Sequence, residues 1–305
     1  MIYKLPKDIK FSTFYKKLNL LSLLLIFISI LIIIFKGLNL GVDFKGGTLI
    51  EVRIENDNIN INQLRQSLLQ MDLGDIKVKK FGQEKDYLVK IEKTDTSNTN
   101  FIKTINKQLV SDLGSNINFR RVENVGPKVS EELLRDGLLA ISLSLAAMLF
   151  YIWIRFEWQF SLGAILAIIH DVIITVGIFS YLSYEVNLSI VAAVLTIVGY
   201  SMNDTVVIFD RIRENLKKYT KSHISEISNI STNQTLSRTL ITSVTTLLAL
   251  LSIYILGGEI LKGFSFAMIV GVIIGTYSSI FVATPVLNYT KVTSKTVLKE
   301  DKDLN

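Results

Sequence analysis

A carboxylate within an apolar helix is the group in this chain best suited to do chemistry. Asp204 lies in the apolar segment 188–209, about one and a half helical turns from the end of that segment. A charged side chain in a bilayer costs a few kcal/mol or more, so it is seldom kept there without a partner or a function. Asp204 could carry a proton or an ion, or it could be a structural contact between helices.

Two further polar groups could belong to the same ion path. Asp171 lies near the middle of the apolar segment 160–183. His170 precedes it, and we expect its side chain to face another direction, because adjacent helical residues point about 100° apart. Arg238, near the start of the segment 236–256, could form an ion pair with Asp204. Alternatively, it could extend to the headgroups and only anchor its helix.

Other polar side chains follow these charged groups at helical spacing and predict a supporting polar face. Such a stripe on an apolar helix should face other helices or water. The residues expected on this face are Thr196, Tyr200, Asn203 and Thr205 around Asp204, and Thr242 one turn after Arg238.

The composition excludes several other kinds of site. The chain has no cysteine, which excludes disulfides, thiolate metal sites and cysteine nucleophiles. No second histidine stands at ligand spacing, so we expect no metal site. No glycine-rich loop leads to Gly-Lys-Ser/Thr, so ATP should not be the energy source. We therefore expect neither an enzyme nor an organic cofactor.

Six segments are long and apolar enough to cross a membrane. Hydrophobic residues make up 49% of the chain and the mean hydropathy is +0.41, while a spanning helix needs ~20 apolar residues. The first segment is too long for a secretory signal and has no cleavage site, so we expect an uncleaved anchor. The expected spans are 18–36, 137–155, 160–183, 188–209, 236–256 and 263–287.

The basic residues predict the topology. The net charge is +6, and lysine and arginine concentrate in 1–17, 210–235 and 288–305. The positive-inside rule makes these three segments the cytoplasmic amino terminus, a cytoplasmic loop and the cytoplasmic tail. Lysines placed beside apolar spans also contact anionic lipid, so nucleic-acid binding is not expected.

Small residues recur every fourth position in the last span and predict close helix packing. Such a stripe lets two helix backbones approach each other. Its members are Gly263, Ala267, Gly271, Gly275, Ser279 and Ala283.

The polar segment 37–136 between the first two spans should be a folded periplasmic domain. Ile50, Val52 and Ile54 alternate with charged residues, as in a half-buried strand. Two helical patterns and three more short strand patterns follow, in the order strand, helix, strand, strand, helix, strand. A small α+β ferredoxin-like sandwich with both helices on one face of the sheet accommodates this order. The expected fold is thus a polytopic membrane protein with one such domain.

Three sequence segments resemble the SecD/SecF protein-export family of the RND superfamily. The resemblance covers nearly the whole chain, including the number of spans and the position of the domain. The first segment contains Gly41, Asp43, Phe44, Gly46 and Gly47, the second contains Gly126 and Pro127, and the third runs from Asn203 to Asn215.

The resemblance implies a six-helix subunit that pairs with SecD to form half of an RND-type core. Such a complex acts beside the SecYEG channel, with YajC as a further partner, in the bacterial inner membrane. It uses the proton-motive force to help preproteins complete translocation. On matching positions, Asp204 would carry the proton, with sodium as the alternative ion, and Arg238 would be its charge partner. Asp171 matches an acid common in the third helix of the family.

Two other functions remain open at this point. One is half of an RND-type small-molecule exporter, although the domain is small for a drug pocket. The other is a passive membrane scaffold whose buried charges serve only assembly. A neutral variant of Asp204 separates the scaffold from the pump.

Overall fold

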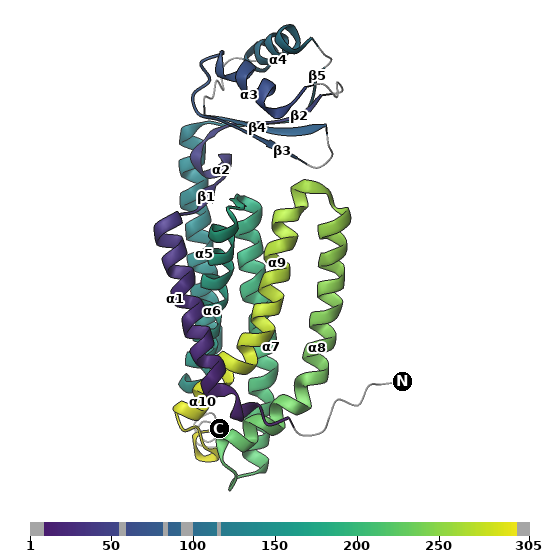
Figure 1. Cartoon of the computed structure of the whole chain (residues 1–305). Helices are drawn as coiled ribbons and strands as arrows, with labels where there is room; N and C mark the ends of the chain where they lie inside the picture. Colours follow the sequence, from purple (N-terminus) through teal and green to yellow (C-terminus); the bar gives the residue numbers. More distant parts are fainter. Residues whose placement is uncertain (1–8, 55–58, 82–84, 93–99, 115–116, 298–305) are drawn as a thin grey trace. The chain divides into compact units, whose positions relative to one another are not determined.

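The computed structural model describes residues 9–54, 59–81, 85–92, 100–114 and 117–297 (Figure 1). The chain divides into two compact units. The membrane unit comprises residues up to Asn39, Ala140–Tyr184 and the chain from Ser189 onward, and the α+β unit comprises Leu40–Leu139 and Glu185–Leu188. The lysines expected at the extreme ends, before residue 9 and after residue 297, lie outside the described residues.

Six described helical segments are long and apolar enough to cross a membrane, which confirms the expected membrane fold. The last is continued by a π-helix and a short α-helix, η2 (Ser279–Ala283) and α10 (Thr284–Tyr289). A short 3-10 helix, η1 (Phe11–Thr13), precedes the first span. The spanning helices are α1 (Tyr15–Lys36), α5 (Pro127–Arg155), α6 (Trp158–Leu182), α7 (Leu188–Lys218), α8 (Ile224–Leu256) and α9 (Gly258–Ser278).

Several helices extend beyond the expected spans. The segment 210–235, expected as a loop, is largely helical, because α7 continues to Lys218 and α8 begins at Ile224. Side-chain amides join the two helices here: Asn215 Nδ2 donates to Ser231 Oγ and to Gln234 Oε1, each at 2.8 Å. Likewise, α5 begins well before residue 137, at a proline that suits a first helical position.

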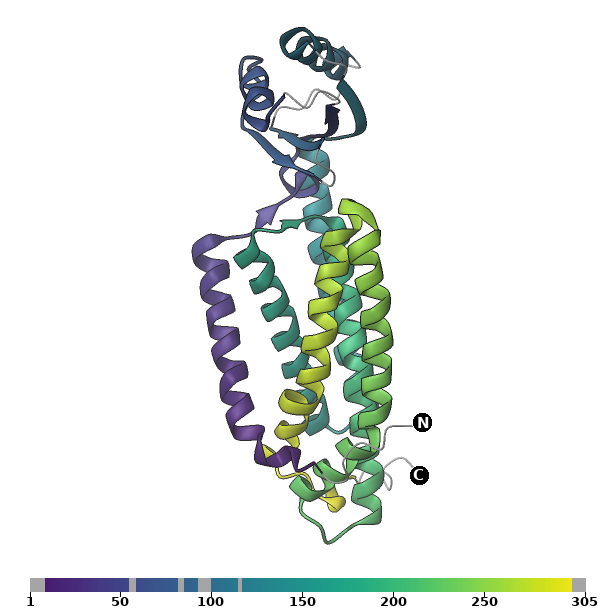
Figure 2. The ribbon, with the colours of Figure 1, turned by 45° about the vertical axis from the view of Figure 1, so that its right-hand side comes forward.

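Helices α6, α7 and α9 form the interior of the membrane unit. In the most apolar 18-residue stretch of these three spans, the buried share is 56%, 50% and 56%. In α1, α5 and α8 the buried share of the same stretch is only 11%, 6% and 17%. Figure 2 shows α9 with α6 on one side and α8 on the other, and α9 contacts both. Buried polar groups on the three interior helices must therefore find their partners on other helices.

The small-residue stripe of the last span packs against α7. A Cβ atom added to Gly271 would lie 2.3 Å from Ile197 Cγ1, and one added to Gly275 would lie 3.0 Å from Ser201 Cβ. At Gly263 the nearest atom would be Ile190 Cδ1, at 3.3 Å. The glycines thus allow α7 and α9 to approach closely, as a small-residue stripe does in membranes.

The α+β unit has the expected ferredoxin-like fold. Its antiparallel sheet has the order β3-β4-β2-β5, in which Ile50 of β2 pairs with Val89 of β4 and Val122 of β5. Both helices lie on one face of the sheet (Figure 1), where Leu64 and Leu68 are fully buried. The elements are β2 (Gly47–Ile54), α3 (Ile61–Leu69), β3 (Ile76–Lys80), β4 (Asp86–Ile91), α4 (Asn100–Leu113) and β5 (Ile117–Val125).

Truncation of Leu64 should destabilise the α+β unit. Leu64 is 0% exposed, so Leu64→Ala leaves a cavity and should cost about 2–5 kcal/mol. Leu69→Ala in the same helix is the control, because Leu69 is 57% exposed. Hydrogen exchange of the β2 and β4 amides measures the effect. Equal exchange rates in the two variants would contradict the assigned core.

Candidate functional site

Asp204 is a buried carboxylate with few hydrogen bonds. It lies in α7 and is 2% exposed. The Thr276 hydroxyl of α9 donates to Asp204 Oδ2 at 3.5 Å, the upper limit of a hydrogen bond. The same hydroxyl can donate at 2.8 Å to the carbonyl of Val272, and a hydroxyl has only one proton to give. The ionised form of Asp204 is therefore poorly compensated in this arrangement.

Arg238 does not form an ion pair with Asp204 in this arrangement. Within the described part of the chain, no basic nitrogen lies within 4 Å of the Asp204 carboxylate. The Arg238 side chain is exposed on α8, from where it acts on Asp204 only through space. Thr242, one turn further, donates its hydroxyl to the Arg238 carbonyl at 3.1 Å.

The expected polar stripe does not share one face with Asp204. Thr196 and Asn203 are exposed, whereas Asp204 and Thr205 are buried. Tyr200 is half-buried and donates to Thr246 of α8 at 3.4 Å. The Thr205 hydroxyl makes no hydrogen bond to any described residue.

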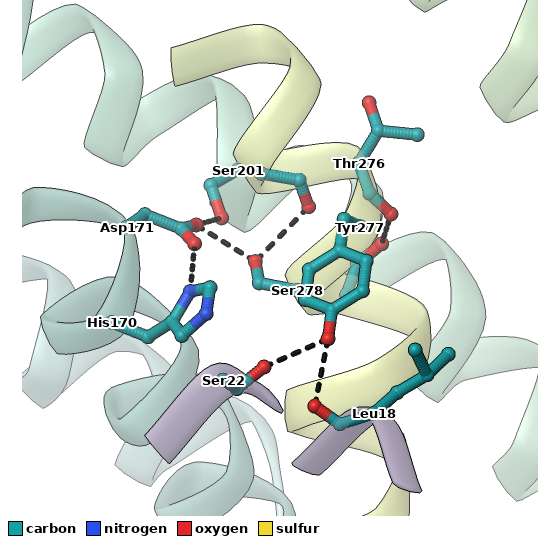
Figure 3. A network of polar contacts seen from close by, with 10 residues as sticks. Leu18, Ser22, His170, Asp171, Ser201, Thr276, Tyr277 and Ser278 are labelled. Atoms are coloured by element: carbon teal, nitrogen blue, oxygen red, sulfur yellow. Dashed lines mark hydrogen bonds and ion pairs between the residues drawn. The ribbon is translucent and has the colours of Figure 1, made fainter. Parts of the chain in front are cut away.

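Asp171 is the centre of a second, well-compensated polar cluster (Figure 3). Its Oδ1 lies 2.8 Å from His170 Nδ1. Its Oδ2 accepts hydrogen bonds from Ser201 of α7 at 2.5 Å and from Ser278 of α9 at 2.8 Å. Asp171 thereby joins the three interior helices. The expectation that His170 faces another direction was wrong, because its ring contacts the carboxylate of Asp171.

Three consecutive residues of α9 connect both acids to other helices. Thr276 contacts Asp204 and shares a hydrogen bond of 2.7 Å with Ser243 of α8. Tyr277 donates to the carbonyl of Leu18 in α1 at 2.9 Å, and Ser278 donates to Asp171 as described above. The π-helix η2 begins at the next residue, and π-helical turns are frequent at functional sites. The sequence reasoning missed this segment, although its hydroxyl groups were the available signal.

The glycine motif after the first span forms a junction within the α+β unit. The amide of Gly41 donates to the carbonyl of Val186, which pairs β1 (Asn39–Leu40) with β6 (Glu185–Val186). The carboxylate of Asp43, in the short helix α2 (Val42–Lys45), accepts a hydrogen bond of 2.9 Å from the amide of Leu188, the first residue of α7. Asp43 thus satisfies one of the free donors at the start of that helix.

Two further glycines of this motif are required by the backbone. Gly46 and Gly47 have φ angles of 73° and 123°, which favour glycine. A Cβ atom on Gly47 would lie 2.6 Å from the carbonyl oxygen of Ile91. Phe44 of the motif is buried.

In the second motif the carbonyl of Gly126 accepts a hydrogen bond from the amide of Ser130, one turn into the helix that Pro127 begins. These motif residues therefore shape the junction.

Lys90 closes the same junction. Its Nζ donates to the carbonyl of Leu40 at 2.9 Å and lies 4.0 Å from Glu185. Burial lowers the pKa of Lys90 below its usual value, partly offset by the attraction of Glu185.

The end of α7 is held by aromatic and ionic contacts. The ring of Phe209 packs against Phe160, with centroids 5.2 Å apart, and against Phe156 at 6.1 Å. Arg213 Nε lies 3.3 Å from Glu157, which is 4% exposed at the start of α6. The third motif thus fixes the C-terminal part of α7 against the α5–α6 connection.

Two family models match this chain. One is described as protein export membrane protein SecD/SecF, C-terminal, and matches residues 105–293. The other is the SecD/SecF GG motif and matches residues 31–57. Together they include all three motifs and both intramembrane acids.

Curated relatives and a solved structure are similar over nearly the whole chain. Protein translocase subunit SecF of Rickettsia bellii is 44% identical over 281 residues, 92% of each protein. SecF of Vibrio alginolyticus is 44% identical over 287 residues, 93% of this chain and 90% of the relative. The crystal structure of SecDF, a translocon-associated membrane protein from a Thermus species, superimposes with a TM-score of 0.86 at 34% identity. That match covers 95% of this chain but spans only 40% of the SecDF chain.

Removal of the Asp43 carboxylate should loosen the start of α7. Asp43→Ala removes the acceptor for the Leu188 amide, and loss of such a cap costs about 0.5–2 kcal/mol. The first amides of α7 should then exchange roughly 2- to 30-fold faster. Asp43→Asn keeps an acceptor oxygen and should retain most of the protection. Equal exchange in wild type and Asp43→Ala would argue against the cap.

Removal of one Asp171 donor should destabilise the interior helices. Ser278→Ala leaves the buried carboxylate with one hydrogen bond fewer, which costs about 1–3 kcal/mol. Ser265→Ala is the matched control, because Ser265 is equally buried on α9 but bonds only to carbonyls of its own helix. Thermal unfolding of the full chain in lipid should show a lower Tm for Ser278→Ala alone. A similar decrease in both variants would mean that the Asp171 bond has no special weight.

Proposed function

This chain belongs to the SecD/SecF family of protein export membrane proteins, and on that basis we propose that it is the SecF-type subunit of a bacterial Sec protein translocase. Its likeness to relatives named SecF extends over nine-tenths or more of both proteins, which supports the same role in export. The protein is thus a transport component and not an enzyme.

The partner that we propose is a SecD-type subunit. The SecDF crystal structure contains a chain of which this protein matches 40%, so a second subunit would supply the remainder. The mostly exposed apolar helices α1, α5 and α8 supply surfaces for such a partner and for lipid. We further propose that the complex acts with SecYEG and YajC on translocating preproteins in the inner membrane. The distribution of basic residues supports cytoplasmic termini.

Asp204 is the residue that we propose as the proton carrier. The observation behind this assignment is the contrast between the two intramembrane acids. Asp171 accepts three hydrogen bonds of 2.5–2.8 Å, so its ionised form is satisfied. Asp204 has one hydrogen bond of 3.5 Å, so in hydrocarbon it gains far more by binding a proton. A proton is therefore the coupling ion that we propose, with sodium as the alternative.

Arg238 would stabilise Asp204 in a second arrangement. When Asp204 loses its proton, the carboxylate needs a cation, and Arg238 is the basic residue that already acts on it through space. Formation of this pair would require α7 and α8 to move relative to each other. Proton binding and release would thereby select between two packings of the membrane helices.

The energy of one proton bounds this mechanism. One charge moving through 100 mV supplies ~2.3 kcal/mol, which shifts a two-state equilibrium roughly fifty-fold. A complete reversal of populations from 1:99 to 99:1 needs about 5.5 kcal/mol. More than one proton for each cycle, or a contribution from the partner, is therefore required.

The variant Asp204→Asn tests the proposal. It keeps the shape of the side chain but cannot ionise, so precursor export should lose its dependence on the proton gradient while the complex still assembles. Asp210→Asn is the control, because Asp210 is near the end of the same helix and half-exposed in a pair with Arg155. The measurement is the rate at which a secretory precursor completes translocation into proteoliposomes, with and without a gradient. Unchanged gradient dependence in Asp204→Asn would leave the chain a passive scaffold.

A further inference from the structure

When Asp171 is ionised, its contact with His170 determines which ring nitrogen of that histidine carries a hydrogen. Both residues are at most 1% exposed. An ionised carboxylate only accepts hydrogen bonds, so His170 Nδ1, which lies 2.8 Å away, must carry a hydrogen. In a neutral imidazole the second nitrogen, Nε2, then has a free lone pair. His170 Nε2 is buried and makes no hydrogen bond to any residue that the structure describes.

Among the described residues, no lysine or arginine lines the groove at the His170 ring. The ring lines an apolar groove of about 610 Å³ between α1, α6 and α9. From α1 the groove receives aliphatic side chains and Ser29, and none of these titrates. The other helices contribute Asp171, the hydroxyls of Ser201 and Ser278, and the phenols of Tyr181 and Tyr277. With neutral His170 the cluster keeps the net charge of −1 of ionised Asp171, whose oxygens have hydrogen-bond donors but no paired cation among the described residues.

One added proton would remove this net charge. On Nε2 it converts the imidazole to an imidazolium, which pairs with the Asp171 carboxylate at the existing contact. The Tyr277 ring stacks on His170 with centroids 5.9 Å apart and an interplanar angle of 26°. The face of an aromatic ring attracts a cation at this distance. The structure thus provides both an anion and an aromatic face for a charged His170.

We propose that His170 and Asp171 form a second proton-binding site, separate from Asp204, in which His170 Nε2 is the basic atom. The lone pair of Nε2 forms the new N–H bond with a proton taken from hydronium, which leaves water, and deprotonation reverses this step. Proton binding at His170 does not depend on the proposed function. A role of this site in the transport cycle does depend on that function.

The two proton sites are connected through adjacent residues of α9. Tyr277, which stacks on His170, also bonds to Ser22 at 2.8 Å and to the carbonyl of Leu18 in α1. Thr276, its neighbour in sequence, contacts Asp204. A change of charge at His170 therefore acts on the segment that also contacts the other acid.

Nitrogen-15 NMR of labelled histidine tests this site directly. The chain contains two histidines, and the other, His223, is exposed at the start of α8. The full chain with His223→Gln in lipid nanodiscs then gives the signals of His170 alone. At high pH we expect the Nδ1–H tautomer, and as the pH falls both nitrogens should take the imidazolium shift in one transition. A ring that stays neutral from about pH 8 to pH 5 in the folded protein would overturn the proposal.

Two variants identify the cause of the transition. Asp171→Asn removes the anion and should move the midpoint to lower pH, and Tyr277→Leu removes the aromatic face and should move it the same way. Ser265→Ala should leave it unchanged. A midpoint that is the same in all three variants would contradict the assigned partners. The spectra do not depend on export, so failure of the Asp204→Asn export test and failure of this site are separate outcomes.

Discussion

The compensation of buried carboxylates governs the interior of the membrane unit. Asp171 on α6 is fully buried, and its oxygens contact His170, Ser201 on α7 and Ser278 on α9. These bonds require the three helices to lie close together, which the glycines of α9 allow at Ile197 and Ser201. The apolar helices α1, α5 and α8 contribute none of these partners of Asp171, and they are mostly exposed. Close packing and polar compensation thus fall on the same helices.

Much of the fold was predictable because two periodicities dominate the sequence. The alternation at Ile50, Val52 and Ile54 gave strand β2, and the length of the apolar segments gave six spans. The helices within the segment 210–235 were not predicted, because charged and polar residues dominate its sequence, although Ile212, Leu216 and Ile227 are buried there and Asn215 bonds to Ser231. Local patterns report burial well, and they report polar contacts between distant segments poorly.

The site was predictable in its acids but not in its geometry. Asp204 and Asp171 stand out because acids are rare in apolar segments. The hydroxyls that bond to them do not, since serine and threonine in helices commonly bond to their own backbone, as Thr245 does with the carbonyl of Ile241. The ring of His170 and the exposed side chain of Arg238 depend on rotamers and on neighbouring helices. Sequence spacing alone does not determine either.

The π-helix in the last span makes the length of this segment critical as well as its composition. The turn Ser279–Ala283 contains a residue in excess of α-helical geometry, directly after the residues that contact both acids. Deletion of a single residue there would restore a regular helix and rotate the preceding turns by about 100° relative to those that follow. Thr276 and Ser278 would then point away from their carboxylates. During divergence, this part of the gene should therefore accept few insertions or deletions.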